Sequence, residues 1–248
     1  RVAYTGSHNM VDPGYGSKTL MWHDLSVRLT GPVALQLQTV FMSDWYFETD
    51  DLLEDPAFFP EVEPRGDMAA QVIPSGPNFE TENYQRLVVA ALHGAQEQVT
   101  ITTPYFVPDE SLLHALETAA LRGVEVNLVV PKEADQYVVG AAARAHYEEL
   151  LNWGIRLYLY TPAIVHAKTM TIDNAIAFVG TSNFDIRSFS LNFEINLAVY
   201  APSFVEKLRN AQRAYMEQSM RLDAETWEQR PSYRRIYQNL AKLFSPLL

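Results

Sequence analysis

The chain contains no cysteine among its 248 residues. Disulfide bonds and thiolate metal sites are therefore excluded, and the redox compartment stays open. A chain of this length buries roughly three quarters of the surface of its unfolded state, so neither kind of cross-link is needed to hold a core. One large domain or two small ones fit the length.

Long apolar runs are also missing. No stretch reaches the roughly 18 residues that a membrane-spanning helix requires. The first residues, "RVAYTGSHNM", do not resemble a signal peptide. The sequence as printed therefore predicts a protein that is soluble or peripheral to a membrane.

Basic residues are few, with 19 Lys and Arg against 30 Asp and Glu and a net charge of −11. Binding to nucleic acid without sequence preference depends on neutralising phosphates, which this balance disfavours. We therefore expect no nucleic-acid partner.

Between residues 68 and 200, apolar β-prone runs alternate with helical ones. Strands are expected at 69–74, 98–108, 124–131 and 155–160, and helices at 82–95, 110–123 and 134–154. Asp109 is placed to cap the second of these helices, while Gly123 and Gly154 are placed to end the second and third. The alternation predicts an α/β fold with buried parallel strands. Residues 50–67 are acidic, rich in proline and without period, which predicts a surface linker.

An internal repeat relates the two ends of the chain. "AYTGSHNMVD" (3–12) resembles "AFVGTSNFDI" (177–186), and "WHDLSVRLTGPV" from Trp22 aligns with "NFEINLAVYAPS" from Asn192, so that Asp24 falls opposite Glu194. We interpret residues 1–66 as the end of a first half-domain plus a linker, and residues 67–248 as a complete second half-domain. Equivalents of His166 and Lys168 would lie roughly nine and seven positions before Arg1.

Polar residues interrupt the apolar strands between Val165 and Tyr200. They are His166, Lys168, Asp173, Ser182, Asn183 and Glu194. Residues two apart in a strand share a face, so His166 and Lys168 are expected to converge on one pocket. Lys168 with Ser182 and Asn183 would neutralise and hydrogen-bond the oxygens of a phosphodiester. Ser7 and Asn9, from the other copy of the loop, are expected to close the phosphate site.

The spacing H-x-K-x-x-x-x-D in "HAKTMTID", followed by "GTSNFD", resembles the phospholipase D superfamily. Within that superfamily "TPYFVPDESLLHAL", "YTGSHNMVDP" and "FSPLL" are similar to bacterial cardiolipin synthases. The resemblance implies a phospholipase D-like fold of duplicated β/α half-domains, with a mixed sheet sandwiched by helices and the active site between the halves. It also implies that the sequence begins inside the first motif.

The resemblance implies roles for these residues. His166 would attack phosphorus and form a phosphohistidine, with Glu194 holding its other ring nitrogen. Asp24 would orient the histidine of the first motif, in a supporting role that Gly180 shares. Asp173 completes the catalytic motif and is expected to brace the strand by hydrogen bonds. No cofactor and no metal is required in this scheme, and which histidine is the nucleophile stays open.

Structural interpretations stand beside these roles. His166 would otherwise be a buried structural histidine, Glu194 merely the ion partner of Lys168, and Ser182 with Asn183 turn formers. Tyr105 and Phe106 either contact acyl chains or belong to a plain strand exit. The remaining histidines are expected to be structural or exposed: His8, His23, His93, His114 and His146.

The last twenty residues, 229–248, contain four basic residues and no acidic one. Ile236, Leu240, Leu243, Phe244 and Leu247 share one helical face. Such a helix either docks on its own domain or binds an anionic lipid surface.

The implied reaction is phosphatidyl transfer between two phosphatidylglycerol molecules, giving cardiolipin and glycerol. A hydrolase of the phospholipase D or phosphodiesterase type is the alternative within catalysis, and a non-catalytic phospholipid-binding fragment is the alternative outside it. The implied partners are phosphatidylglycerol, other anionic phospholipids and the membrane surface, and the implied location is the bacterial cell membrane. The sequence leaves the oligomeric state open.

Overall fold

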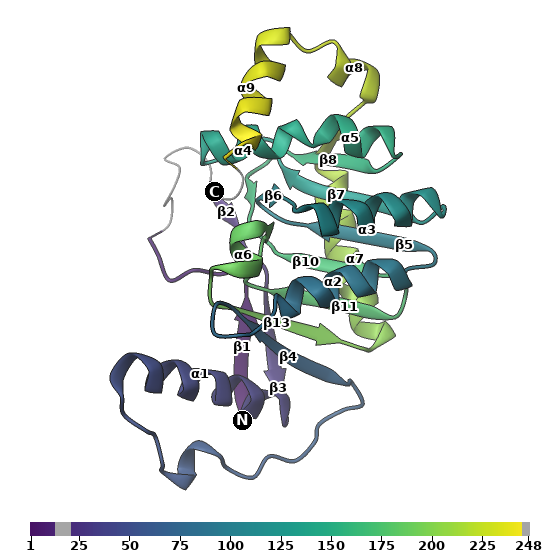
Figure 1. The fold of residues 1–248 in the computed structure, drawn as a ribbon. Coiled ribbons are helices and arrows are strands. Elements are labelled where there is room, and N and C mark those ends of the chain that lie inside the picture. The colour runs from purple at the N-terminus through teal and green to yellow at the C-terminus, as the bar shows by residue number, and fades with distance from the viewer. Residues whose placement is uncertain (13–20, 245–248) are drawn as a thin grey trace.

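The computed structural model describes residues 1–12 and 21–244. Within them, eight strands form one mixed sheet in the order β14-β8-β7-β5-β10-β11-β13-β4 (Figure 1). The bounds of these strands are β4 Ala70–Ser75, β5 Gln98–Thr102, β7 Glu125–Pro131, β8 Arg156–Tyr160, β10 Thr169–Ile172, β11 Ile176–Gly180, β13 Glu194–Val199 and β14 Ser219–Arg221.

Strand direction follows the connections between the strands. β5, β7 and β8 are parallel neighbours because a helix returns the chain between each pair. β10 and β11 form an antiparallel hairpin, and β10 also pairs antiparallel with β5. The predicted mixed sheet is confirmed, and the buried parallel strands lie where the β/α alternation placed them.

Helices cover both faces of the sheet. On one face lie α2 (Asn83–Gly94), α3 (Glu110–Leu121), α4 (Tyr137–Ala145) and α5 (Tyr147–Asn152), and on the other lies α7 (Pro202–Glu217) (Figure 1). Alternate residues of a strand serve the two layers, so Leu128 joins the larger core while Val129 packs with Tyr215 of α7.

The chain ends its helices largely where the sequence indicated. The Asp109 carboxylate accepts a hydrogen bond from Leu112 N at 3.1 Å and caps α3. Gly123 and Gly154 follow α3 and α5 with left-handed φ angles of 89° and 82°. One difference is that the helix expected over 134–154 is two helices, α4 and α5, which meet at His146. This side chain is 2% exposed, and burial lowers its pKa to about 3.

The N-terminal residues form a separate two-stranded sheet of β1 (Val2–Gly6) and β3 (Ser26–Thr30), with α1 (Val33–Thr49) beside β4. Residues 50–69 are irregular apart from η1 (Pro56–Phe58), as expected for the linker. The short strand β2 (Trp22–His23) leaves this region and pairs in parallel with β9 (Ile164–Val165). The division into 1–66 and 67–248 stays a prediction.

The chain ends in α8 (Ala224–Glu228) and α9 (Ser232–Lys242). α9 packs on α4 through a face that buries Gln238 and Ala241. The apolar face expected from the sequence points away from this contact, and Leu247 lies outside the described residues. Of the described helices, none has the length and apolar character to cross a membrane.

Candidate active site

Most of the predicted site residues gather at one edge of the large sheet, and Asp173 is the exception. β10 runs antiparallel to β5, so its first residue, Thr169, pairs with Thr102 at the carboxyl end of β5. Gly180, at the end of β11, donates its N–H to Lys168 O at 3.2 Å. His166 and Lys168 lie in the short segment between β9 and β10, which is not part of a regular strand.

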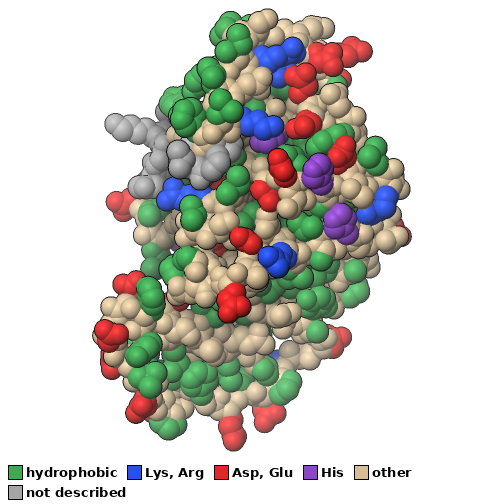
Figure 2. Space-filling model, in the orientation of Figure 1, with side chains coloured by type: hydrophobic (Ala, Val, Ile, Leu, Met, Phe, Trp, Pro, Cys, Tyr) green, Lys and Arg blue, Asp and Glu red, His purple; other side chains and the backbone are tan. Residues whose placement is uncertain are grey.

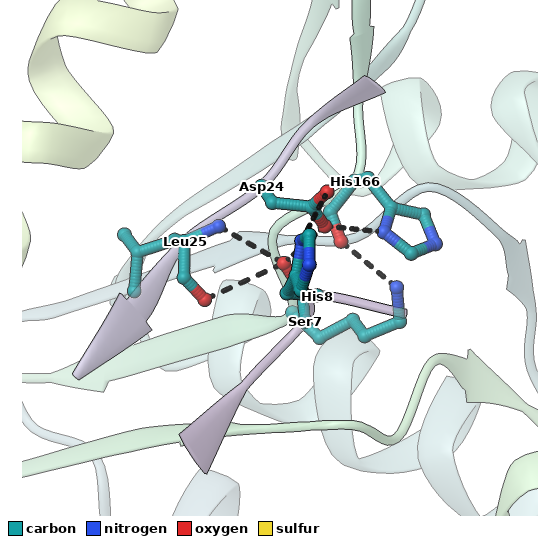
Figure 3. Close-up of polar contacts among 6 residues, drawn as sticks. Ser7, His8, Asp24, Leu25 and His166 are labelled. Atoms are coloured by element: carbon teal, nitrogen blue, oxygen red, sulfur yellow. Dashed lines mark hydrogen bonds and ion pairs between the residues drawn. The ribbon is translucent and has the colours of Figure 1, made fainter. Parts of the chain in front are cut away.

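His166 is held by Asp24. The Nδ1 atom of His166 lies 2.6 Å from Asp24 Oδ1 (Figure 3), and since a carboxylate only accepts, the ring donates from Nδ1. The parallel pairing of β2 with β9 sets this register, because His166 N donates to His23 O at 2.9 Å. The expectation that Glu194 holds His166 is wrong. Asp24 directly follows β2, and the pairing of β2 with β9 places its carboxylate, not that of Glu194, on His166 Nδ1.

Asp24 is itself fixed by Ser7. The Ser7 hydroxyl donates to Asp24 Oδ1 at 2.7 Å and accepts from Leu25 N at 2.9 Å. Ser7 is 2% exposed, so its hydroxyl faces the carboxylate and not a phosphate, contrary to expectation. The other oxygen, Oδ2, lies 3.7 Å from Nδ1 of His8, an exposed residue that sequence reasoning set aside (Figure 3).

The second half repeats this arrangement bond for bond. The Thr181 hydroxyl donates to Glu194 and accepts from Ile195 N at 2.9 Å. Ser7 N donates to Leu25 O and Thr181 N to Ile195 O, both at 3.0 Å. Ser7 therefore corresponds to Thr181, and Asp24 corresponds to Glu194.

Each loop begins at a glycine that leaves no room for a side chain. A Cβ on Gly180 would lie 2.6 Å from Ile195 O and 2.7 Å from Asn196 Cα, and one on Gly6 would lie 2.6 Å from Ser26 Cα. The close approach of two backbones is what allows the hydroxyl after each glycine to reach its acid.

Lys168 carries the only basic group among the described residues that line the adjoining cleft, apart from Arg1 at the end of the chain. The side chain is 7% exposed, and Nζ donates to His166 O at 2.8 Å. Burial lowers its pKa to about 7, although the carboxylates of Asp24 and Glu194 favour the charged form.

Burial and hydrogen bonds act in opposite directions on the Asp24–His166 pair. Burial disfavours the Asp24 carboxylate, but hydrogen bonds from His166 and Ser7 outweigh it, so its pKa lies below the ordinary value. Burial, with the charge of Lys168, lowers the pKa of His166 despite the opposing effect of Asp24. His166 is therefore neutral and Asp24 charged at neutral pH.

A cleft of about 1310 Å³ opens between the N-terminal elements and the edge of the sheet. Four of the predicted residues line it, namely Asn9, Lys168, Asn183 and Glu194. His166 is not among the lining residues, and its backbone oxygen accepts a hydrogen bond from Lys168, which is. Ser75, opposite Glu194 in the pairing of β4 with β13, also lines it and was not predicted. The lining also includes four aromatic residues, Phe41, Phe47, Phe79 and Phe193.

Ser182 does not line the cleft. Its hydroxyl accepts from Asn196 Nδ2 at 2.7 Å, and the residue is 1% exposed. Side chains of an extended segment alternate in direction, so Thr181 and Asn183 face the cleft while Ser182 faces away. The prediction of Ser182 as a phosphate ligand is therefore wrong in direction.

Asp173 braces the hairpin, and sits far from the cleft at the other end of β10. Its carboxylate accepts from three backbone N–H groups, those of Gln96, Glu97 and Gln98, at 2.9, 2.8 and 2.9 Å. Its own backbone adopts a left-handed φ of 49° in the turn to β11. These bonds place Asp173 in a structural part of the motif.

Tyr105 and Phe106, which follow β5, make a polar contact and a core contact within the protein. The Tyr105 hydroxyl donates to Asp135 Oδ1 at 2.7 Å, and Phe106 is fully buried in the core. Asp135, which sequence reasoning missed, lies close enough for its charge to act on both His166 and Lys168. Its position after β7, at the same edge of the sheet, is the feature that indicates it.

The family model described as "Cardiolipin synthase, PLD-like domain" matches residues 88–215. Among curated proteins, the chain is 42% identical over 254 residues to cardiolipin synthase A of Yersinia pseudotuberculosis, and 42% identical over 255 residues to that of Serratia proteamaculans. Both alignments cover 100% of this chain and 52% of the relative. The chain thus spans about half the length of the curated relatives it matches.

Solved structures share the fold. Phosphatidylserine synthase of Haemophilus influenzae superposes over 93% of this chain and 65% of its own, with a TM-score of 0.68 and 15% identity. Nuc of Salmonella typhimurium, a phospholipase D family member, superposes over 63% of this chain and 99% of its own, with a TM-score of 0.54 and 22% identity.

The close backbone approach at Gly180 yields a test of the loop. Gly180→Ala should lower the free energy of unfolding by about 1–3 kcal/mol, because the new methyl group meets backbone atoms that cannot turn aside. Chemical denaturation measures this change in the free energy of unfolding. Gly94→Ala is the matched control, because a Cβ there meets nothing within 4 Å. Equal stability of the two variants would contradict the packing described for the loop.

Proposed function

Since the chain belongs to the family of cardiolipin synthases with a phospholipase D-like domain, we propose that the whole protein transfers a phosphatidyl group between two phosphatidylglycerol molecules, forming cardiolipin and releasing glycerol. The observation that carries the proposal is the Asp24–His166–Lys168 arrangement at the edge of the cleft. It joins a neutral nucleophile of fixed tautomer to a buried cation, which is what displacement at a phosphodiester requires.

The first step uses His166. Because Nδ1 donates to Asp24, the lone pair lies on Nε2, which attacks phosphorus. A bond forms from Nε2 to phosphorus, the bond from phosphorus to the glycerol oxygen breaks, and the leaving oxygen takes a proton from a general acid. The phosphoimidazolium that results is stabilised by the Asp24 carboxylate.

The phosphate would sit at the polar end of the cleft. Lys168 offers the charge, and the side-chain amides of Asn183 and Asn9 offer hydrogen bonds as negative charge grows on the phosphoryl oxygens. The phenylalanine side chains among the lining residues suit a lipid acceptor better than water, which favours transfer over hydrolysis.

Glu194 would orient the general acid. Its equivalence to Asp24, bond for bond, predicts that it holds a second histidine from an equivalent motif in the part of the protein that lies outside this chain. That histidine protonates the leaving glycerol and then removes the proton from the hydroxyl of the second phosphatidylglycerol. The oxygen of this second lipid attacks phosphorus and breaks the bond to Nε2, which regenerates neutral His166.

The membrane surface is the proposed location, and α9 is its proposed contact. Six apolar side chains of α9 and the two residues after it are 52–74% exposed, namely Tyr233, Ile236, Tyr237, Leu240, Leu243 and Phe244. Hydrophobic side chains show at the top of Figure 2, where α9 lies. Three of the four nearby basic residues are ion-paired, Arg230 and Arg235 with Glu148 and Lys242 with Glu149. Contact with a bacterial phospholipid surface should thus depend more on apolar insertion than on charge.

His166→Asn in the full-length protein should lower phosphatidyl transfer by at least about 1,000-fold, because Asn cannot attack phosphorus. Glu194→Gln should be milder, since it keeps a hydrogen-bond acceptor. Thin-layer analysis of lipid products measures both and separates cardiolipin from phosphatidic acid, the product of hydrolysis. Transfer by His166→Asn within about tenfold of wild type would refute the proposal.

The pH dependence of kcat/KM should reflect the protonation of Lys168. The group must be protonated, so kcat/KM should fall as pH rises through a pKa of about 7, and should fall on the acid side as His166 gains a proton. Lys168→Arg keeps its charge at every accessible pH, so its alkaline limb should move to higher pH, where only the general-acid histidine still limits the rate. A wild-type profile that stays flat to about pH 9 would show that Lys168 is not the charged group required.

Binding to vesicles tests α9. Leu240→Ser with Leu243→Ser should weaken sedimentation with phosphatidylglycerol vesicles by about tenfold or more, as burying each Leu contributes roughly 1.5–3 kcal/mol. Leu121→Ser, at a residue 74% exposed on α3, is the matched control. Unchanged vesicle binding of the α9 variant would mean that this face meets another protein surface instead.

A further inference from the structure

The indole ring of Trp22 lies flat against the imidazole of His166. The ring centroids are 4.2 Å apart and the planes are inclined by 15°, which is a stacked contact. Neither the motif nor the repeat singles out Trp22, and the proposed chemistry assigns it no part.

A single short strand supplies two contacts to His166. In the parallel pairing of β2 with β9, Trp22 lies opposite Ile164 and His23 opposite Val165. Trp22 and Asp24 are two residues apart and so project to the same side, Trp22 onto the face of the imidazole and Asp24 onto its Nδ1 edge. His23 projects the other way, and its Nδ1 lies 2.8 Å from the Tyr160 hydroxyl.

We propose that Trp22 is a positioning residue, which fixes the plane of the His166 ring so that Nε2 points at the reacting phosphorus. The catalytic part of this inference rests on the proposed function; the structural part, that Trp22 orients the ring, does not.

A hydrogen bond at one nitrogen leaves a ring free to swing about that bond. Asp24 touches His166 only through Nδ1, so it sets the tautomer and the distance but not the plane of the ring. The stacked indole removes the remaining freedom. Because near-attack geometry must hold to within a fraction of an ångström, a group that fixes the plane contributes to rate without touching the substrate.

The stack also keeps water from one face of the imidazole, whose residue is 4% exposed in total. A smaller side chain at residue 22 would admit water to this face of the ring.

Three variants separate positioning from packing. In Trp22→Leu the rate constant kcat should fall by about 100-fold with KM changed less than about twofold, because the ring is misplaced while the phosphate ligands remain. Trp22→Phe restores a stacking face and should recover kcat to within about tenfold of wild type. Trp153→Leu, at a partly buried tryptophan that packs against the core away from the site, should change stability without changing kcat.

Nuclear magnetic resonance measures the pKa of the His166 ring without an enzyme assay. Trp22→Leu should raise the pKa of His166, because burial is the main cause that lowers it, whereas Asp24→Asn should lower it further. Trp22→Phe should leave it near the wild-type value. If the wild-type protein shows no phosphatidyl transfer, the proposed function fails while these ring measurements still decide the role of Trp22.

An unchanged His166 pKa in Trp22→Leu, or a kcat within about threefold of wild type, would overturn the inference. The same holds if Trp22→Phe is as slow as Trp22→Leu, since aromatic stacking would then not be the cause. If Trp22→Leu does not fold, Trp22→Met, which keeps more apolar volume but has no aromatic face, replaces it in the same comparison with Trp22→Phe.

Discussion

The pairing of β2 with β9 is the contact on which the site depends. Two residue pairs of parallel ladder bring a segment from the N-terminal region alongside the strand that leads into His166. That register sets Asp24 on the ring edge at 2.6 Å and Trp22 on the ring face at 4.2 Å. His166 therefore belongs by sequence to one repeat and by its contacts to the other. A shift of one residue in this ladder would turn both side chains away from the ring, which makes the junction between the repeats part of the candidate active site.

The burial of Lys168 is the second constraint. A charge removed from water is costly, and here the carboxylates of Asp24, Glu194, Asp185 and Asp135 act on one ammonium group. Burial nonetheless prevails and leaves the pKa of Lys168 near 7, so the proposed phosphodiester substrate would stabilise the ammonium with its own negative charge. The same burial keeps His166 neutral. In the proposed mechanism, one low-dielectric pocket thus prepares both the nucleophile and the cation.

Much of this could be predicted from periodicity and repetition. The β/α alternation predicted that β5, β7 and β8 are parallel and buried, and the repeat predicted the correspondence of Asp24 with Glu194. Symmetry establishes that two acids are equivalent, but not which histidine each one serves, and so the sequence led to the wrong partner for His166. The predictions for Ser7 and Ser182 were wrong because each hydroxyl was assumed to face the site. In an extended segment successive side chains point to opposite sides, so a residue next to the site can point away from it. Trp22 could have been noticed only by asking what lies two residues before Asp24.

The central claim is that Asp24 reaches across from the other repeat to fix the tautomer of His166. Nitrogen-15 chemical shifts of the imidazole test it most directly. At neutral pH the ring should carry its proton on Nδ1 with Nε2 bare, and Asp24→Asn should disturb this state while Glu194→Gln leaves it intact. A ring protonated on Nε2, or one that responds to Glu194→Gln and not to Asp24→Asn, would contradict the account.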